Sequence, residues 1–424
     1  MNRAIALLGC VAISSVVIQS QTASNPSGTA SSSAQTVVAP HSPAPSGTFG
    51  IGRTGYDWTD NSRPDRYSTD QQAHRELMVY VWYPTSQKDA KTKGTYLPYA
   101  KEMDAVPDIQ HSMQQEFEGN WPLIVSGSIT SHVRDGAPIA NNPRRFPVVL
   151  LSHGSGGTTF EYTSLIEDLV SHGYVVAAIE HTYTAIAVAF PNGKIVPFHQ
   201  DSIPANLSPE QRFQRMMSEA SLGIDEGAAD IRFVLDKLTE LNSGDPQDFL
   251  LARRLDVNNV AAIGHSAGGV FATRACELDG RFKACVDLDG AMMPVAALPV
   301  GPDGKTMQQP LLFLEAYHPE SRMGGTHAQI EEYFKKKEQQ LQSCPAGSYN
   351  VILKSAGIVH GSFSDYSLLV AGGDTNATAM ALHNIYLTQI FTRAFLDKYL
   401  KHEKGPLFEG KEYLAEATVQ QYGH

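Results

Sequence analysis

The chain has 424 residues, enough to bury a large core, and its 44 acidic residues outnumber 33 Lys and Arg to give a net charge of −11. This charge disfavours nucleic acid and anionic lipid surfaces as partners. The sequence contains no HExxH motif, phosphate-binding loop, EF-hand loop or cysteine cluster with zinc spacing, so we expect no metal and no cofactor.

The N-terminal residues have the order of an export signal. In residues 1–22, the basic Arg3 precedes an apolar run over 4–18 and then small, polar residues. The run is shorter than the ~20 residues of a spanning helix, so we predict a signal peptide over a membrane anchor or lipoprotein box. Residues 23–48 are rich in Ser, Thr, Ala and Pro and predict a flexible linker. We expect a secreted or periplasmic protein with no stable membrane span.

Residues 49–402 alternate strand and helix patterns, and we expect 403–424 to be a C-terminal tail. Continuous apolar runs and helical spacing predict strands at 75–84, 146–152, 174–180, 257–264, 283–289, 310–316 and 349–354, and helices at 161–172, 227–241, 268–276 and 379–400. This alternation predicts an α/β class protein, with a mostly parallel, doubly wound sheet and helices on both faces. Residues 87–140 are irregular and are expected to wrap the core. The proline-rich segment at about 182–221 predicts a cap-like insert.

A glycine-rich loop, Ser152–Phe160 (SHGSGGTTF), follows the predicted strand 146–152. Loops at this place supply a backbone amide to the oxyanion of an acyl-transfer intermediate. We therefore predict that the oxyanion hole is formed by the N–H group of Ser155 in this loop and that of Ala267, the residue after the candidate nucleophile. His153 precedes the candidate nucleophile described next, and we expect it to hold the loop by hydrogen bonds.

The pentapeptide Gly264-His265-Ser266-Ala267-Gly268 joins the predicted strand 257–264 to the predicted helix 268–276. A Gly-x-Ser-x-Gly sequence arises by chance in roughly one chain of this size in five, so its context decides its meaning. On a strand-to-helix turn the serine hydroxyl stands exposed above the sheet, and the glycines remove Cβ atoms that would clash. This context makes Ser266 the candidate nucleophile.

The candidate base is His360, in the loop after the last predicted strand. In α/β folds with a serine nucleophile at this kind of turn, the catalytic residues follow along the chain in the order serine, acid, histidine. His318 comes too early, and His383 lies inside a helix. Asp289 ends the strand that follows the nucleophile helix and is the preferred acid. Glu315, which ends the next strand, and Asp287 remain alternatives.

Three cysteines follow the predicted signal peptide: Cys276, Cys285 and Cys344. An oxidising compartment allows a Cys276–Cys285 disulfide, and three buried thiols are the alternative.

Five stretches together resemble the platelet-activating-factor acetylhydrolases, the α/β-hydrolase family that includes the lipoprotein-associated phospholipase group and bacterial and fungal relatives. They read FPVVLLSHGSGGTTFEYTSLIEDLVSHGYVVAAIEH, IGHSAGG, RFKACVDLDGAMMP, QQPLLFLEA and IVHGSFSDYSLL, and the likeness covers about residues 50–400. The resemblance implies a triad of Ser266, Asp289 and His360 with Ser155 and Ala267 amides as oxyanion donors. Gly290–Ala291 and the 182–221 insert depart from the animal enzymes and bear on the pocket.

The function that this resemblance implies is hydrolysis of short-acyl esters, such as a phospholipid with an sn-2 acetyl or truncated chain. We therefore expect a 1-alkyl-2-acetylglycerophosphocholine esterase-like serine hydrolase, with a small ester or lipid as its substrate. A general carboxylesterase or a polyester or cutinase-like hydrolase is the alternative within enzymes. A non-catalytic binding protein of the same fold and a serine peptidase are further alternatives.

Overall fold

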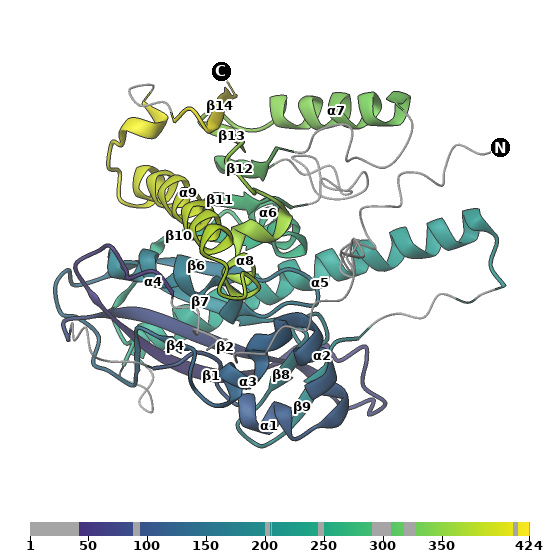
Figure 1. Ribbon diagram of the computed structural model, residues 1–424, viewed down its shortest axis with the longest axis vertical. Coiled ribbons are helices and arrows are strands. Elements are labelled where there is room, and N and C mark those ends of the chain that lie inside the picture. Colours follow the sequence, from purple (N-terminus) through teal and green to yellow (C-terminus); the bar gives the residue numbers. More distant parts are fainter. Residues whose placement is uncertain are drawn as a thin grey trace, which may run out of the picture.

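The computed structural model describes residues 42–87, 94–199, 204, 206–244, 250–290, 307–317, 327–409 and 414–423 (Figure 1). The predicted signal peptide and most of the predicted linker lie outside these residues. The last part of that linker contacts helix α4 (Thr163–Ser171), where the Gly47 N–H donates to Ser171 Oγ at 2.9 Å. Among the described residues, no helix has both the length and the apolar composition to cross a membrane.

The described residues form a main sheet of ten strands. Across this sheet the strand order is β14-β13-β12-β11-β10-β6-β7-β2-β1-β5 (Figure 1). The strands from β13 to β7 in this order run parallel, whereas β14, β2 and β1 are antiparallel to neighbours. Their bounds are β1 Gly50–Pro64, β2 His74–Thr85, β5 Val133–Asp135, β6 Phe146–Ser152, β7 Val175–Glu180, β10 Leu255–His265, β11 Phe282–Leu288, β12 Leu311–Ala316, β13 Ser348–Leu353 and β14 Ala417–Tyr422.

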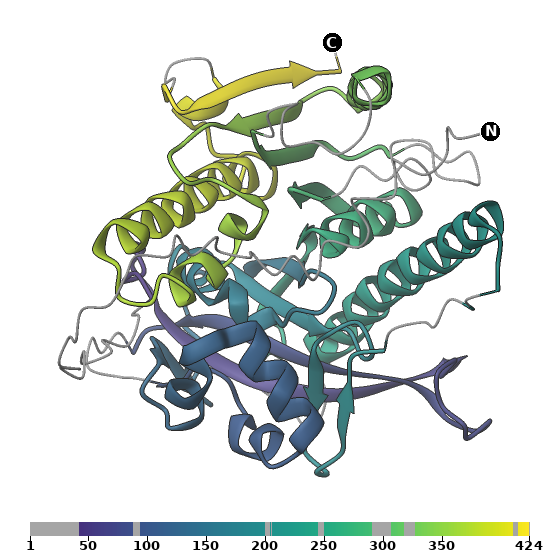
Figure 2. The ribbon, with the colours of Figure 1, turned by 45° about the vertical axis from the view of Figure 1, so that its right-hand side comes forward.

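Helices cover both faces of this sheet. Helices α4 and α9 (Thr375–Leu400) share one hydrophobic core with Val149 and Leu151 of β6. Helices α5 (Pro209–Gly244) and α6 (Ala267–Leu278) share the other core with Val148 and Leu150. In Figure 2, α9 lies on one side of the sheet and α5 and α6 on the other. The apolar run of β6 is thus buried on both faces, and the predicted α/β-hydrolase architecture is confirmed.

Two predictions about the ends of the sheet are wrong. Strand β1 precedes the strand that we predicted as the first, and β14 forms inside residues 403–424, which we expected to be a tail. Both sequences are polar because much of each strand faces solvent. Within the described part of the chain, strand β14 pairs on one side only, with β13, and β5 covers only Ile51–Arg53 of β1. Such exposed strands lack the apolar run that marks a buried strand.

Residues 87–140 contain short helices and strands where we expected irregular structure. Buried apolar side chains of these helices, including Met113, Phe117 and Trp121, join the core under α4 and α9. The remaining described elements outside the main sheet are α1 Ala100–Asp104, α2 Pro107–Phe117, α3 Trp121–Val125, α7 His327–Gln342, α8 Tyr366–Leu369, β3 Gly94–Thr95, β4 Thr130–Ser131, β8 Ala187–Ala189 and β9 Ile195–Pro197, with 3₁₀ turns at Glu118–Asn120, Thr159–Tyr162, His360–Phe363 and Pro406–Phe408.

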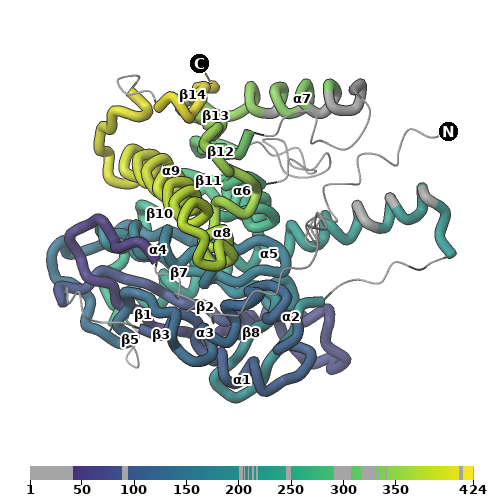
Figure 3. Tube along the Cα trace, in the orientation of Figure 1, coloured from purple at the N-terminus to yellow at the C-terminus, as the bar shows by residue number. Residues whose placement is uncertain are grey.

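The predicted insert at 182–221 does not form a single element: part of it is a β-hairpin and part belongs to helix α5. Its first part contains the β8–β9 hairpin, and its last part forms the first turns of α5, which begins well before the predicted start at 227. Proline is compatible with the first helical position, and Ser208 and Gln211 cap this end by reciprocal hydrogen bonds. The first half of α5 extends beyond the body of the sheet (Figures 2 and 3).

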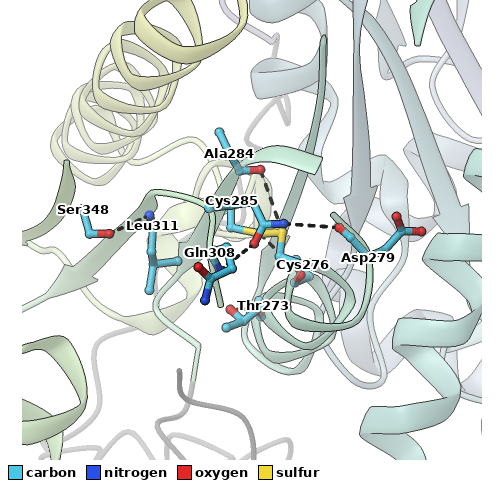
Figure 4. Close-up of a disulfide and its surroundings, with 11 residues drawn as sticks. Thr273, Cys276, Asp279, Ala284, Cys285, Gln308, Leu311 and Ser348 are labelled. Atoms are coloured by element: carbon cyan, nitrogen blue, oxygen red, sulfur yellow. Dashed lines mark hydrogen bonds between the residues drawn. A yellow bond between two sulfur atoms is a disulfide. The ribbon is translucent and has the colours of Figure 1, made fainter. Parts of the chain in front are cut away.

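A disulfide joins Cys276 of α6 to Cys285 of β11 (Figure 4). Cys344 is buried outside this pair. Because α6 begins directly after Ser266 and β11 ends directly before Asp289, the disulfide links the two elements that carry these candidate residues.

Candidate active site

The candidate residues gather at the carboxyl edge of the parallel strands. Gly264 of β10 pairs with Ser152 of β6, and His265 pairs with Leu288 of β11. The loops that follow these strands therefore begin at the same level. Ligand sites of α/β sheets lie at this edge.

Ser266 occupies the sharp turn between β10 and α6. Its φ and ψ are 56° and −124°, and its N–H donates to the Leu288 carbonyl at 3.0 Å. A Cβ at Gly264 would lie 2.1 Å from the carbonyl carbon of Gly268, and one at Gly268 would lie 2.4 Å from the Ser152 oxygen. Larger residues would clash at both glycines. The turn thus holds a half-buried serine in strained backbone, as expected of a nucleophile elbow.

The glycine-rich loop after β6 lies directly against Ser266. A Cβ at Gly154 would be 3.3 Å from the Ser266 Cβ. Within the loop, the Gly157 N–H donates to Gly154 O at 3.1 Å, and the Gly156 N–H donates to Thr184 O at 2.8 Å. Among the described residues, the N–H groups of Ser155 and Ala267 donate no hydrogen bond, so both are available to a ligand.

The structure brings His360 and Asp289 together. His360 Nδ1 lies 2.7 Å from Asp289 Oδ2, and the His360 side chain is 46% exposed. One contact holds the backbone and one the carboxylate of Asp289: its N–H donates to Leu314 O at 2.7 Å, and its Oδ1 accepts from the Ala316 N–H at 3.0 Å. Asp289 also has a positive φ of 50°. The exposed imidazole is thus oriented by an acid held on the edge of the sheet.

The alternative acids and bases have other partners. Glu315 forms a buried ion pair with Lys337, and Asp287 Oδ1 accepts from the Gly290 N–H at 2.7 Å. His383 Nε2 lies 2.8 Å from Glu416 in an exposed pair. His318 lies outside the described residues. Of the three carboxylates that the sequence leaves open, Asp289 is the one that contacts His360.

Asp287 is expected to weaken the fold as the pH rises. Burial, together with the nearby carboxylates, raises the pKa of Asp287 to about 8 from an ordinary 3.8. Between these values only the folded state holds the proton, so the free energy of unfolding falls with pH by up to about 1.4 kcal/mol per unit. Asp287→Asn removes this loss, so its stability gain over the wild type should be larger at pH 8 than at pH 5 in urea unfolding. A gain that is equal at both values would contradict the raised pKa.

A buried polar network lies beneath the glycine-rich loop. The His181 N–H donates to His153 Nε2 at 3.2 Å, so this nitrogen accepts, and His153 Nδ1 donates to Gly154 O at 2.7 Å. His181 continues the network, because its Nε2 lies 2.9 Å from Ser152 Oγ and its Nδ1 lies 2.9 Å from Asp230 Oδ2. His153 thus makes the loop-holding contacts that the sequence suggests.

Ser152, His181 and Asp230 contact one another in the same sequence, serine to histidine to aspartate, as the side chains of a catalytic triad, but they lie in the protein interior. All three residues are fully buried. Burial lowers the pKa of His181 to about 4. Burial opposes ionisation of Asp230, but Arg75 and His181 outweigh it and hold the pKa of Asp230 far below its usual range. This set was not predicted from the sequence, although His181 directly follows strand β7, at the edge where functional polar residues gather.

The strand order and the strand-turn-helix at Ser266 define an α/β-hydrolase fold. A model of the family "Platelet-activating factor acetylhydrolase, isoform II" matches residues 36–383. The chain belongs to this family, and it is a carboxylic ester hydrolase.

Named relatives agree with this assignment. The chain is 27% identical over 354 residues to the platelet-activating factor acetylhydrolase of Cavia porcellus, covering 78% of this chain and 74% of that protein. It is 26% identical over 348 residues to a probable 1-alkyl-2-acetylglycerophosphocholine esterase of Arthroderma benhamiae, covering 78% of each. A solved ferulic acid esterase from Streptomyces cinnamoneus matches with a TM-score of 0.65 and 25% identity, over 90% of this chain and 99% of that one.

Proposed function

We propose that the chain is a secreted serine esterase that uses Ser266, His360 and Asp289 to hydrolyse short-acyl esters, with a phospholipid bearing an sn-2 acetyl or truncated chain as its substrate. The observation that carries the proposal is the 2.7 Å contact between His360 Nδ1 and Asp289 Oδ2 at the edge where Ser266 forms its strained turn. Secretion follows from the predicted signal peptide.

The geometry supports a two-step acyl transfer. Because His360 Nδ1 faces Asp289, its Nε2 is the nitrogen left to take the proton from Ser266 Oγ as the oxygen attacks the ester carbonyl carbon. The carbonyl oxygen becomes an oxyanion that accepts hydrogen bonds from the Ser155 and Ala267 N–H groups. The carbon–oxygen bond to the alcohol then breaks, and His360 returns the proton to the leaving alcohol.

Deacylation repeats these roles with water. His360 removes a proton from water, the hydroxide attacks the acyl-serine, and the carboxylic acid leaves as Ser266 regains its proton. Asp289 keeps His360 in the required tautomer and stabilises the imidazolium without taking the proton itself. No step in this sequence requires a metal or cofactor.

The names of the relatives support acetylated ether phospholipid as the substrate class, whereas the ferulic acid esterase favours a broader carboxylesterase. To separate these, the purified protein is given the acetyl, butyryl and octanoyl nitrophenyl esters, an sn-2 acetyl phosphatidylcholine and methyl ferulate. We expect kcat/KM to fall from acetyl to octanoyl and to be highest for the phospholipid. Equal or faster turnover of methyl ferulate, with no phospholipid hydrolysis, would reject the phospholipid assignment and retain the esterase.

A further inference from the structure

Two buried side chains that the proposed mechanism does not use connect the glycine-rich loop to the loop of His360. Tyr162 ends the 3₁₀ turn Thr159–Tyr162, and His265 is the last residue of β10, directly before Ser266. The Gly154 N–H donates to Tyr162 Oη at 3.2 Å. Tyr162 Oη lies 2.8 Å from His265 Nδ1, and His265 Nε2 lies 2.9 Å from the backbone oxygen of His360.

The direction of each hydrogen bond follows from the chemistry of its groups. The His360 carbonyl only accepts, so His265 carries a proton on Nε2. Burial, together with the neighbouring His360, lowers the pKa of His265 to about 3, so this imidazole is neutral and its Nδ1 accepts. Burial keeps the pKa of Tyr162 well above its ordinary value, so its hydroxyl is protonated and donates to that nitrogen. The bridge therefore has one arrangement of protons.

The bridge anchors Gly154, the residue directly before the proposed oxyanion donor Ser155. Gly154 is fixed through its N–H by Tyr162 and through its carbonyl by His153 and Gly157. Because a peptide unit is planar, fixing the Gly154 carbonyl also fixes the direction of the Ser155 N–H. The Gly154 N–H belongs to the preceding peptide unit, so its bond to Tyr162 anchors the residue that joins the two units.

The other end of the bridge touches the candidate base. Besides its hydrogen bond to the His360 carbonyl, the His265 ring packs on the His360 ring with centroids 4.6 Å apart and planes at 36°. His265 is 6% exposed and Tyr162 is 2% exposed, so water does not compete strongly for these contacts.

We propose that Tyr162 and His265 are positioning residues that couple the oxyanion loop to the base, so that the Ser155 N–H and the His360 imidazole keep a fixed separation around Ser266. The inference rests on the proposed serine mechanism. It gives a chemical role to the residue before the nucleophile, which in a Gly-x-Ser-x-Gly pattern is unspecified.

Tyr162→Phe tests the bridge, because it removes the shared oxygen and keeps the ring. A misplacement of the reacting groups lowers the rate, so we expect kcat for nitrophenyl acetate to fall by about 10- to 100-fold while KM changes less than about twofold. The rate constant for labelling by a fluorophosphonate, which also develops negative charge on an oxygen in the hole, should fall by a similar factor. The matched control is Tyr83→Phe, which removes a buried hydroxyl that donates to Ala137 O at 2.8 Å on a different part of the sheet.

His265 supplies a second test that does not depend on the stability of Tyr162→Phe. Glutamine has an amide donor and an acceptor to replace those of the imidazole, whereas leucine has neither, so His265→Gln should retain more kcat than His265→Leu at equal KM. The proposal is overturned if Tyr162→Phe keeps kcat and the labelling rate within about twofold of wild type, or if Tyr83→Phe lowers them equally. Absence of labelling of the wild-type protein would instead reject the proposed function, so the two failures are distinguishable.

Discussion

Replacing Ser266 with Ala is expected to lower kcat for nitrophenyl acetate by about 10⁵-fold, because the variant has no oxygen to form the acyl-enzyme. The remaining oxyanion donors and His360 would leave only slow, water-mediated hydrolysis. KM would report binding alone and should change little. Steady-state rates at enzyme concentrations high enough to exceed the uncatalysed reaction measure the effect, and thermal unfolding confirms that the variant folds.

The matched control for Ser266→Ala is Ser152→Ala. Both serines lie at the carboxyl end of a central strand, and Ser152 Oγ lies 2.9 Å from His181 Nε2, but Ser152 is fully buried. A fluorophosphonate should therefore label wild type and Ser152→Ala, and fail to label Ser266→Ala. Labelling of Ser266→Ala at the wild-type rate would assign the nucleophile to another residue.

Asp289→Asn is expected to lower kcat by about 10⁴-fold at neutral pH, because an amide no longer stabilises the imidazolium and permits the wrong imidazole tautomer. The 2.7 Å contact from Asp289 Oδ2 to His360 Nδ1 is the interaction that this variant changes. The loss should be smaller for fluorophosphonate labelling at high pH, where a hydroxide-rich solution partly replaces the general base. Rates between pH 6 and pH 10 measure both effects.

Asp287→Asn is the control for Asp289→Asn, since the two residues lie two positions apart near the end of β11. Burial raises the pKa of Asp287 to about 8, so an uncharged amide resembles its neutral form, and we expect kcat at pH 7 to stay within about threefold of wild type. An equal loss of kcat in both variants, or a loss below tenfold in Asp289→Asn, would contradict the assignment of the acid.

The fold could be predicted wherever strands are buried on both faces. The run FPVVLLS predicts β6 with the same bounds as the structure, because parallel central strands need apolar residues on both sides. Strand β14 was not predicted because, among the residues that the structure describes, it pairs along one edge, and its residues face solvent in part. The start of α5 was not predicted because Pro209 belongs to the proline-rich segment that predicts an insert, whereas proline is compatible with the first helical turn.

The candidate site was predictable to the extent that its signals are local. Ser266 is marked by its own pentapeptide, and the glycine-rich loop by its place after a strand. For the acid, the sequence favours Asp289 but leaves Asp287 and Glu315 open, because all three lie near strand ends. The contact of Asp289 with His360 separates them. The Tyr162–His265 bridge joins residues 103 positions apart, and no short pattern in the sequence marks such a pair.

The interior set of Ser152, His181 and Asp230 bears on how hydrolases are recognised in general. A three-residue template that compares only side-chain types and hydrogen-bond distances would retrieve this set, since its two contacts are each 2.9 Å long. The template would thus rank a part of the scaffold beside the candidate catalytic group. In this protein the useful discriminator is solvent access to the hydroxyl, and a search for new esterases gains more from scoring that access than from tightening the distances.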